Sequence, residues 1–243
     1  PVYSYDNRTW THFRDDETEW DEAQIRLTLR FRPTKARMWI AHMQPYTQRQ
    51  LPRAQHTLIN GSIPLFTITD PGAAPKKHIW LMARQHAWEA GTSWMADGAI
   101  RFLLSAQGAR LRRDNVFHIL PMFEPAGDAK GFVRFNAAGF DNNRNWDTAT
   151  PALMLEISAV RDLLLREPID IFLALHNTVS SDYVEGPRNA TAQRLSDCLR
   201  SNSTFVDPRS PRDGVSQSVD TGRMMVHQFL FAKRSVPAFL MER

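Results

Sequence analysis

The chain of 243 residues contains a single cysteine, Cys198. One cysteine cannot form an internal disulfide, and it cannot build a metal site from several thiolates. The sequence also lacks an apolar run of about 18 residues, the length that would suggest a membrane span, and it lacks a repeat of fixed period. With an apolar fraction of 42% and a charged fraction of 23%, this composition indicates an ordinary globular protein without a membrane partner.

The N-terminus shows no signal peptide, and together with the lack of disulfides this favours a cytoplasmic location. The printed sequence starts at Pro1, which leaves room for an upstream segment that has been removed. Composition does not determine the oligomeric state.

The surface is expected to be mildly basic, since the net charge is +4 and the isoelectric point is about 9.5. Three explanations fit this balance: a solvated surface rich in Arg, a preference for acidic peptide tails, or nucleic-acid binding. The Arg residues are scattered, and their densest run, 110–113, is typical of a helix end, where cations suit the helix dipole. We therefore take a solvated surface as the default and expect no nucleic-acid partner.

The N-terminal part of the chain has the alternating pattern of a small β-structure. Residues 25–31 and 37–43 each alternate between apolar and polar side chains, and Pro33 marks a turn between them. We expect these two strands to form one hairpin of a β-sandwich. The domain boundary is expected near residue 50, with a sandwich portion at 1–50 and a larger domain at 51–243.

Strands and helices alternate along the larger domain. The patterns predict strands at 63–68, 78–84, 116–122, 169–175 and 236–242, and helices at 89–105, 150–167, 190–200 and 222–233. This alternation predicts an α/β domain with a mixed central sheet and helices on both faces, and it places functional residues near the strand ends.

Candidate metal ligands follow two of the predicted strands. His86 and Glu89 lie three residues apart just after one strand, and His176 directly follows another. Two His and one Glu form the ligand set of a catalytic zinc site that keeps a position open for water. Taken singly, each motif is weak, because such spacings arise by chance and a lone His at a strand end is usually just hydrogen-bonded.

A loop rich in Gly and Asn, Gly131–Trp146, strengthens the zinc hypothesis. It contains Arg134 and Arg144 ten residues apart, with Asn143 next to the second Arg. A guanidinium group binds a carboxylate through two parallel hydrogen bonds. A zinc-bound water beside such a carboxylate site would describe an enzyme that cuts near a free C-terminus.

The chain resembles the zinc carboxypeptidases, and most of all their cytosolic-carboxypeptidase branch, which includes the tubulin deglutamylases and bacterial relatives. The resemblance runs from about Met38 to Glu242 and depends on several blocks in the family's order. Five blocks of the family have a counterpart here. Arg84–Glu89 matches RxHPGE, Glu124–Gly127 matches NPDG, and Gly131–Trp146 matches GxxRxNxxGxDLNRxW. Leu175–Asn177 matches DxHxH/N, and Val236–Glu242 matches (F/L)xxE. A PYT element of the branch's N-terminal β-sandwich resembles Pro45–Thr47.

The resemblance implies one zinc ion, a peptide or protein C-terminus as substrate, and roles for seven residues. These are zinc ligation for His86, Glu89 and His176, general base and acid catalysis for Glu242, binding of the terminal carboxylate for Asn143 and Arg144, and polarisation of the scissile carbonyl for Arg134.

The chain departs from the family pattern in loops rather than in ligands. Glu124 and Ala126 replace the Asn and Asp of NPDG, and Asn142 replaces the Leu of DLNR. The family's Tyr some twenty residues before the catalytic Glu has no counterpart, and His227 is the candidate to stand in its place.

Two other functions stay open: a related zinc amidohydrolase or deacylase, and a catalytically impaired binding module on the same fold. Retention of Arg134, Asn143 and Arg144 argues against the first, and retention of all the ligands argues against the second. The branch resemblance and the basic balance favour a C-terminal Glu or Asp as the released residue.

Overall fold

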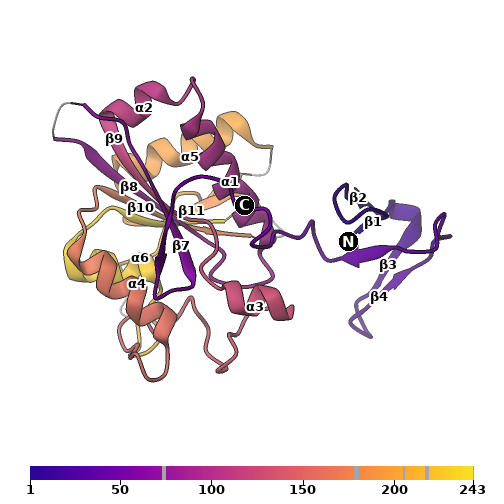
Figure 1. Cartoon of the computed structure of the whole chain (residues 1–243). Helices are drawn as coiled ribbons and strands as arrows, with labels where there is room; N and C mark the ends of the chain where they lie inside the picture. Colours follow the sequence, from indigo (N-terminus) through magenta and orange to yellow (C-terminus); the bar gives the residue numbers. More distant parts are fainter. Residues whose placement is uncertain (73–74, 178–180, 205, 217–218, 243) are drawn as a thin grey trace. The chain divides into compact units, whose positions relative to one another are not determined.

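The computed structural model describes residues 1–72, 75–177, 181–204, 206–216 and 219–242. The chain forms two compact units, Pro1–Tyr46 and Thr47–Arg243 (Figure 1). None of the described helices is long and apolar enough to cross a bilayer.

Unit 1 is built from short antiparallel strands. One sheet has the order β2-β1-β5, and β3 pairs with β4 in a separate hairpin. The elements are β1 Val2–Ser4, β2 Thr11–His12, the 3-10 helix Asp15–Glu17, β3 Thr18–Asp21, β4 Arg26–Leu29 and β5 Trp39–Ala41.

The hairpin predicted between residues 25–31 and 37–43 is wrong. Strand β4, in the first segment, pairs with the preceding strand β3, and β5, in the second segment, pairs with β1. A tight local turn explains the difference, because Asp21 Oδ1 accepts from the Gln24 N–H at 3.0 Å and Ile25 turns the chain with a φ of 50°. Residues 18–21 carry no apolar period, so the sequence pattern did not reveal this nearer partner.

Unit 2 contains an eight-stranded sheet in the order β12-β11-β13-β10-β8-β9-β7-β6. Strands β13, β10, β8 and β9 are parallel to one another, whereas β7 runs antiparallel to β9 and β11 runs antiparallel to β13. The strands are β6 Thr57–Ile59, β7 Ile63–Ile68, β8 Lys77–Ala83, β9 Asn115–Leu120, β10 Ile171–His176, β11 Tyr183–Gly186, β12 Arg212–Asp213 and β13 Ala238–Glu242.

Helices cover both faces of this sheet (Figure 1). They are α1 Ala90–Leu104, α2 Ala109–Asp114, α3 Pro125–Lys130, α4 Leu155–Arg166, α5 Ala190–Asn202 and α6 Val226–Arg234. Along β10, Phe172 and Ala174 join the apolar core under α4 and α6, while Leu173 and Leu175 face the core under α1. The predicted α/β fold with a mixed sheet and helices on both faces is therefore confirmed.

Every strand and helix predicted for this unit is present, with ends shifted by a few residues. The sequence patterns missed β6, β11, β12 and α3, and gave α2 only as a helix end at 110–113. The three strands have two to four residues, too few for a clear alternation, and the six residues of α3, PAGDAK, carry no apolar stripe.

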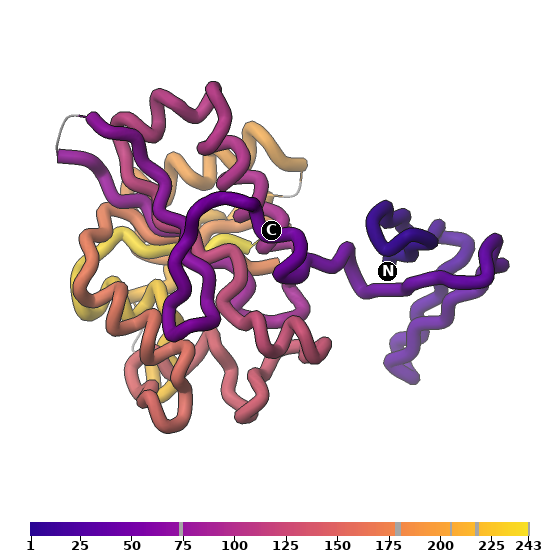
Figure 2. The backbone as a smooth tube through the Cα atoms, in the orientation of Figure 1, coloured from indigo at the N-terminus to yellow at the C-terminus, as the bar shows by residue number. Residues whose placement is uncertain are grey.

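The pairing of the central strands determines where the candidate site lies. Strands β8, β10 and β13 are parallel neighbours, with Leu175 opposite Ala83 and His176 opposite Glu242. Their carboxyl ends therefore meet at one edge of the sheet, as the backbone trace shows (Figure 2).

A buried pair joins the two loops that depart from the family pattern. Glu124 is the N-cap of α3, and its Oε1 accepts from the Gly127 N–H at 2.8 Å. Its Oε2 accepts from Asn142 Nδ2 at 2.7 Å, and both side chains are buried. The Glu of the first loop and the Asn of the second thus form one interaction. Burial raises the pKa of Glu124, while these hydrogen bonds oppose the rise.

Replacing Asn142 by Leu is expected to lower the free energy of unfolding by about 1–3 kcal/mol, because a buried carboxylate loses a donor. The loss should be larger at neutral than at acid pH. A raised pKa means that burying the ionised Glu124 costs stability as the pH rises, and Asn142 reduces this cost by donating to the ionised form. Urea unfolding at neutral and at acid pH measures this change in the free energy of unfolding, and Gln193→Leu on the exposed side of α5 is the control. Equal stability of Asn142→Leu and the unsubstituted protein would contradict the pairing.

Candidate metal centre and substrate-binding residues

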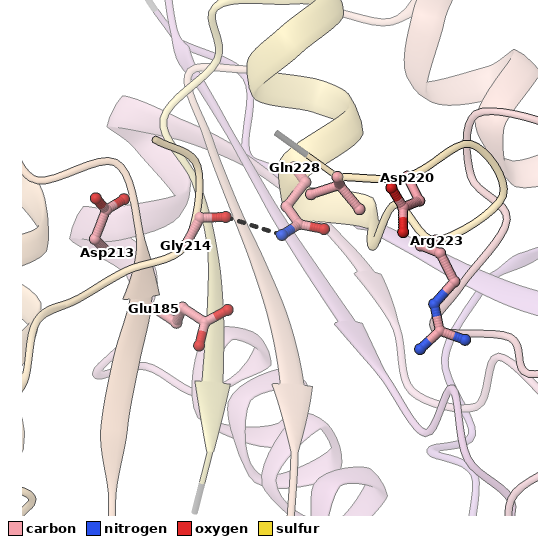
Figure 3. A pocket seen from close by; sticks show the side chains of 7 residues that line it. Glu185, Asp213, Gly214, Asp220, Arg223 and Gln228 are labelled. Atoms are coloured by element: carbon pink, nitrogen blue, oxygen red, sulfur yellow. Dashed lines mark hydrogen bonds between the residues drawn. The ribbon is translucent and has the colours of Figure 1, made fainter. Parts of the chain in front are cut away.

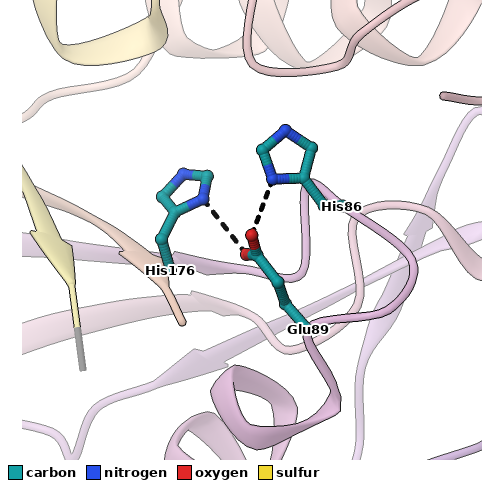
Figure 4. Close-up of side chains that lie close together, drawn as sticks. All are labelled: His86, Glu89 and His176. Atoms are coloured by element: carbon teal, nitrogen blue, oxygen red, sulfur yellow. Dashed lines mark hydrogen bonds and ion pairs between the residues drawn. The ribbon is translucent and has the colours of Figure 1, made fainter. Parts of the chain in front are cut away.

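Three predicted ligands converge at the carboxyl ends of β8 and β10. His86 lies in the loop after β8, Glu89 is the N-cap of α1, and His176 ends β10. Each offers a possible ligand atom, and these atoms all lie within 4.8 Å of one another. All three residues are buried. Figure 4 shows both imidazoles turned toward the Glu89 carboxylate.

Arg84 shapes the loop that carries two of these ligands. Its backbone takes a φ of 60°, which turns the chain out of β8. Its Nε donates to the Ala87 carbonyl at 2.9 Å, and its guanidinium pairs with Asp128 of α3. These contacts support a role for Arg84 in bracing the loop.

Each imidazole presents its Nδ1 to the same carboxylate. His86 Nδ1 lies 2.7 Å from Glu89 Oε1, and His176 Nδ1 lies 3.1 Å from Glu89 Oε2. The second distance lacks hydrogen-bond geometry, so Glu89 Oε2 is buried without a hydrogen-bond partner among the described residues. Two ring nitrogens and an unsatisfied carboxylate oxygen around one point are a donor set that fits a divalent cation such as zinc.

The opposite nitrogens of the two rings have partners that orient them. His86 Nε2 lies 3.0 Å from Asp141 Oδ1, and His176 Nε2 lies 3.1 Å from Gln85 Oε1. Gln85 Nε2 donates to the Asn142 carbonyl at 2.7 Å, so its oxygen must face the His176 ring. That oxygen accepts a hydrogen bond from the Nε2–H group, which leaves Nδ1 unprotonated and able to bind a metal.

Gln85 and Asp141 are supporting residues that the sequence motifs do not predict. Both lie inside motif blocks, next to His86 and near Asn143 and Arg144. Only the approach of distant segments shows their function, since each partner is more than fifty residues away.

Charges around the cluster keep its carboxylates ionised. Burial alone would raise the pKa of Glu89, but His176 and His86 overcome this effect and hold it at about 2. Burial also opposes ionisation of Asp141, yet His86, the Asn143 N–H and Arg134 keep its pKa well below the usual range. The site thus presents negative charge to a cation before any cation binds.

Glu242 lies beside the cluster but is not one of its members. It ends β13 opposite His176 in the sheet register, and its Oε2 is buried without a hydrogen bond among the described residues. Burial raises the pKa of Glu242. A carboxyl group held near a metal site with a raised pKa is suited to exchanging protons.

Arg134 and Arg144 line one cavity of about 560 Å³, together with Asp141 and Arg223. Arg134 Nε donates to Asp141 Oδ2 at 2.8 Å, and Arg144 Nη1 donates to the Asn143 carbonyl at 2.7 Å. Burial lowers the pKa of Arg144, and the charges of Arg134 and Arg223 lower it further. Three guanidinium groups that converge in this way favour an anion in the cavity.

Asn143 is not among the residues that line this cavity. Its side chain is buried, and its Oδ1 has no hydrogen-bond partner among the described residues.

His227 does not take the place of the family's Tyr. It lies on α6 and is fully buried, so it cannot swing over a substrate as an exposed loop side chain could. The suggestion that His227 serves this role is therefore wrong. A helical pattern does not distinguish a buried polar position from an exposed one when the facing strand is unknown.

Comparison with known proteins points to one family. Residues 38–184 match the model of the zinc carboxypeptidase family. Cytosolic carboxypeptidase 2 of Xenopus tropicalis is 33% identical over 168 residues, which is 57% of this chain and 17% of that protein. The chain spans less than half the length of the curated relatives it matches.

Two solved structures share the fold over 99% of this chain and 70% of their own chains. The metallo-carboxypeptidase of Burkholderia cenocepacia has a TM-score of 0.82 at 23% identity. That of Pseudomonas aeruginosa, solved with (2-guanidinoethylmercapto)succinic acid, has a TM-score of 0.80 at 22% identity. Because the family match covers more than half of the sequence, this chain belongs to the zinc carboxypeptidases, a family of peptide hydrolases, and has the cytosolic carboxypeptidases among its relatives.

Proposed function

We propose that this chain is a zinc-dependent metallocarboxypeptidase that hydrolyses the C-terminal peptide bond of peptides or proteins. The observation that carries the proposal is the convergence of His86, Glu89 and His176 at the same sheet edge as Glu242. We place the reaction in the domain at 51–243 and regard residues 1–50 as a portion of a β-sandwich.

His86, Glu89 and His176 would hold one zinc ion. When bound, zinc supplies a Lewis acid and lowers the pKa of a coordinated water to about 7. Glu242 would accept the proton of the attacking water and deliver it to the leaving amine. Its raised pKa suits this exchange, because a carboxyl group whose pKa lies closer to neutral pH can both accept a proton and donate it.

Arg144 and Arg134 would each bind a different negatively charged group of the substrate. Arg144 and Asn143 would bind the terminal carboxylate, and Arg134 would stabilise the oxyanion that develops on the scissile carbonyl. The 560 Å³ cavity that both Arg residues line supports this division. Asp141 would position a metal ligand and an oxyanion-binding group at once, since its carboxylate contacts both His86 and Arg134.

The alternatives from the sequence have less support. An amidohydrolase or deacylase would retain the metal ligands without needing several guanidinium groups in one cavity. A catalytically impaired binding module would not need Glu242 to lie beside His176 in the strand register.

A preference for C-terminal Glu or Asp, which the branch resemblance predicts, would need positive charge where the substrate's last side chain binds. A second cavity of about 400 Å³ shares Arg223 with the first, and its lining also includes Glu185, Asp213 and Asp220. Arg223 is the cation among these described lining residues that could support an acidic preference. The ligand of the Pseudomonas protein combines a guanidino group with succinic acid, which suggests that one relative binds both charges.

Replacing Glu242 by Gln should reduce kcat by about 10²–10⁴-fold, because the amide cannot carry the proton. Metal analysis should still find about one zinc per chain, since Glu242 is outside the ligand set. Activity close to that of the unsubstituted enzyme would refute the proposed base.

Replacing His176 by Ala should abolish stoichiometric zinc binding, because two remaining ligands rarely hold the ion. Metal analysis after dialysis against a weak chelator measures this loss, and His12→Ala, an exposed residue of unit 1, is the control. Zinc retained by His176→Ala would place the metal elsewhere.

Replacing Arg144 by Gln should lower kcat/KM by about 10–100-fold on peptides with a free C-terminus, the scale of lost hydrogen bonds to a charged group. The variant should also lose the ability to discriminate between free and amidated C-termini. Arg200→Gln, at a partly exposed ion pair on α5, controls for loss of charge. Full discrimination by the Arg144 variant would exclude it as the carboxylate site.

A further inference from the structure

We propose that the second cavity binds the side chain of the substrate's C-terminal residue, and that Glu185 selects a positively charged one, Lys or Arg. The inference depends on the proposed carboxypeptidase function, because it assigns a substrate class to that site. It replaces the acidic preference predicted from the sequence.

The position of Glu185 connects this cavity to the catalytic residues. It lies on β11, which pairs with β13 so that Tyr183 is opposite Glu242 and Glu185 is opposite Leu240. Glu185 also interacts electrostatically with Arg144 and with Glu242. A residue whose carboxylate binds at Arg144 would therefore have its side chain within range of Glu185.

The charges that line the cavity do not all face its centre. Figure 3 shows the Glu185 carboxylate pointing into the cavity, whereas the Asp213 carboxylate points away from it. Asp213 accepts from the Val215 and Ser216 N–H groups at 3.1 and 3.0 Å, so its charge stabilises its own turn. Three of the four charged residues in the lining are acidic, and Arg223 is the cation among them. The excess of negative charge, with the Glu185 carboxylate directed into the cavity, favours a cationic ligand.

A buried histidine lies behind Glu185. His227 is fully buried, and neither of its ring nitrogens has a hydrogen bond among the described residues. Its Nε2 lies 3.5 Å from Glu185 Oε1, beyond good hydrogen-bond geometry, so His227 does not hold this carboxylate in place. Burial lowers the pKa of His227, which favours a neutral ring that does not offset a negative charge. The Glu185 carboxylate, which lines the cavity, therefore stays available to a cation.

Gly214 keeps this wall open. A Cβ atom at this position would lie 2.5 Å from Glu185 Cγ and 3.0 Å from His227 Nε2. A larger residue would therefore displace Glu185, which lines the cavity, and His227 behind it.

The two cavities together have complementary charges for a substrate with two charged ends. The guanidinium groups of Arg134 and Arg144 line the first cavity, and the Glu185 carboxylate faces the second. A C-terminal Lys or Arg carries a carboxylate and a cation in the matching order. A C-terminal Glu would instead bring its side-chain carboxylate toward Glu185, and like charges repel.

The test is a panel of peptides that differ only in a C-terminal Lys, Arg, Leu or Glu, with zinc-loaded enzyme. The unsubstituted enzyme should release Lys and Arg with a higher kcat/KM than Glu. Glu185→Gln should lower kcat/KM for Lys and Arg by about 10–100-fold and leave Leu within about twofold, while Glu185→Lys should favour Glu. Asp197→Asn, which removes one exposed carboxylate of α5, should leave the ranking unchanged.

Faster release of Glu than of Lys or Arg would overturn the proposal, as would an unchanged ranking in Glu185→Gln. If no peptide is cleaved, the carboxypeptidase function fails, and calorimetric binding of the same peptides to zinc-loaded Glu242→Gln decides the pocket chemistry separately. Tighter binding of Lys and Arg peptides then supports the assignment of Glu185, and equal or weaker binding refutes it.

Discussion

The parallel pairing of β8, β10 and β13 is the constraint on which the candidate site depends. A parallel register brings the carboxyl ends of neighbouring strands to one edge, and here it sets Ala83 beside Leu175 and His176 beside Glu242. A shift by one residue would turn each side chain to the opposite face of the sheet. Apolar cores on both faces hold the register, since alternate residues of β10 pack against helices on opposite sides.

Much of the fold of unit 2 could be predicted from the sequence because its long elements have complete periods. Strand β7 spans the predicted residues 63–68, and α4 lies within the predicted helix at 150–167, with Ile157, Val160 and Leu164 in the core. Unit 1 shows where such patterns fail. The alternation in β4 was recognised, but its partner was not, because pairing is decided by a turn whose side-chain contact at Asp21 leaves no hydrophobic signal.

The three metal-binding candidates could be found from the sequence because each directly follows a strand or opens a helix. Their supporting groups could not. Gln85 and Asp141 orient rings that arrive from distant parts of the chain. Glu124 and Asn142 look like two unrelated departures from the family pattern until folding places them 2.7 Å apart. Contacts between separate loops are invisible to local spacing.

Glu89 has two structural roles, since it opens α1 and faces both imidazoles. A bound cation would therefore fasten the first turn of that helix, and α1 in turn packs on the sheet through Ala96 and Ile100. Ligand binding to the native state stabilises it by mass action. Zinc supply would then influence how long the folded enzyme survives, because the zinc-loaded chain unfolds less often.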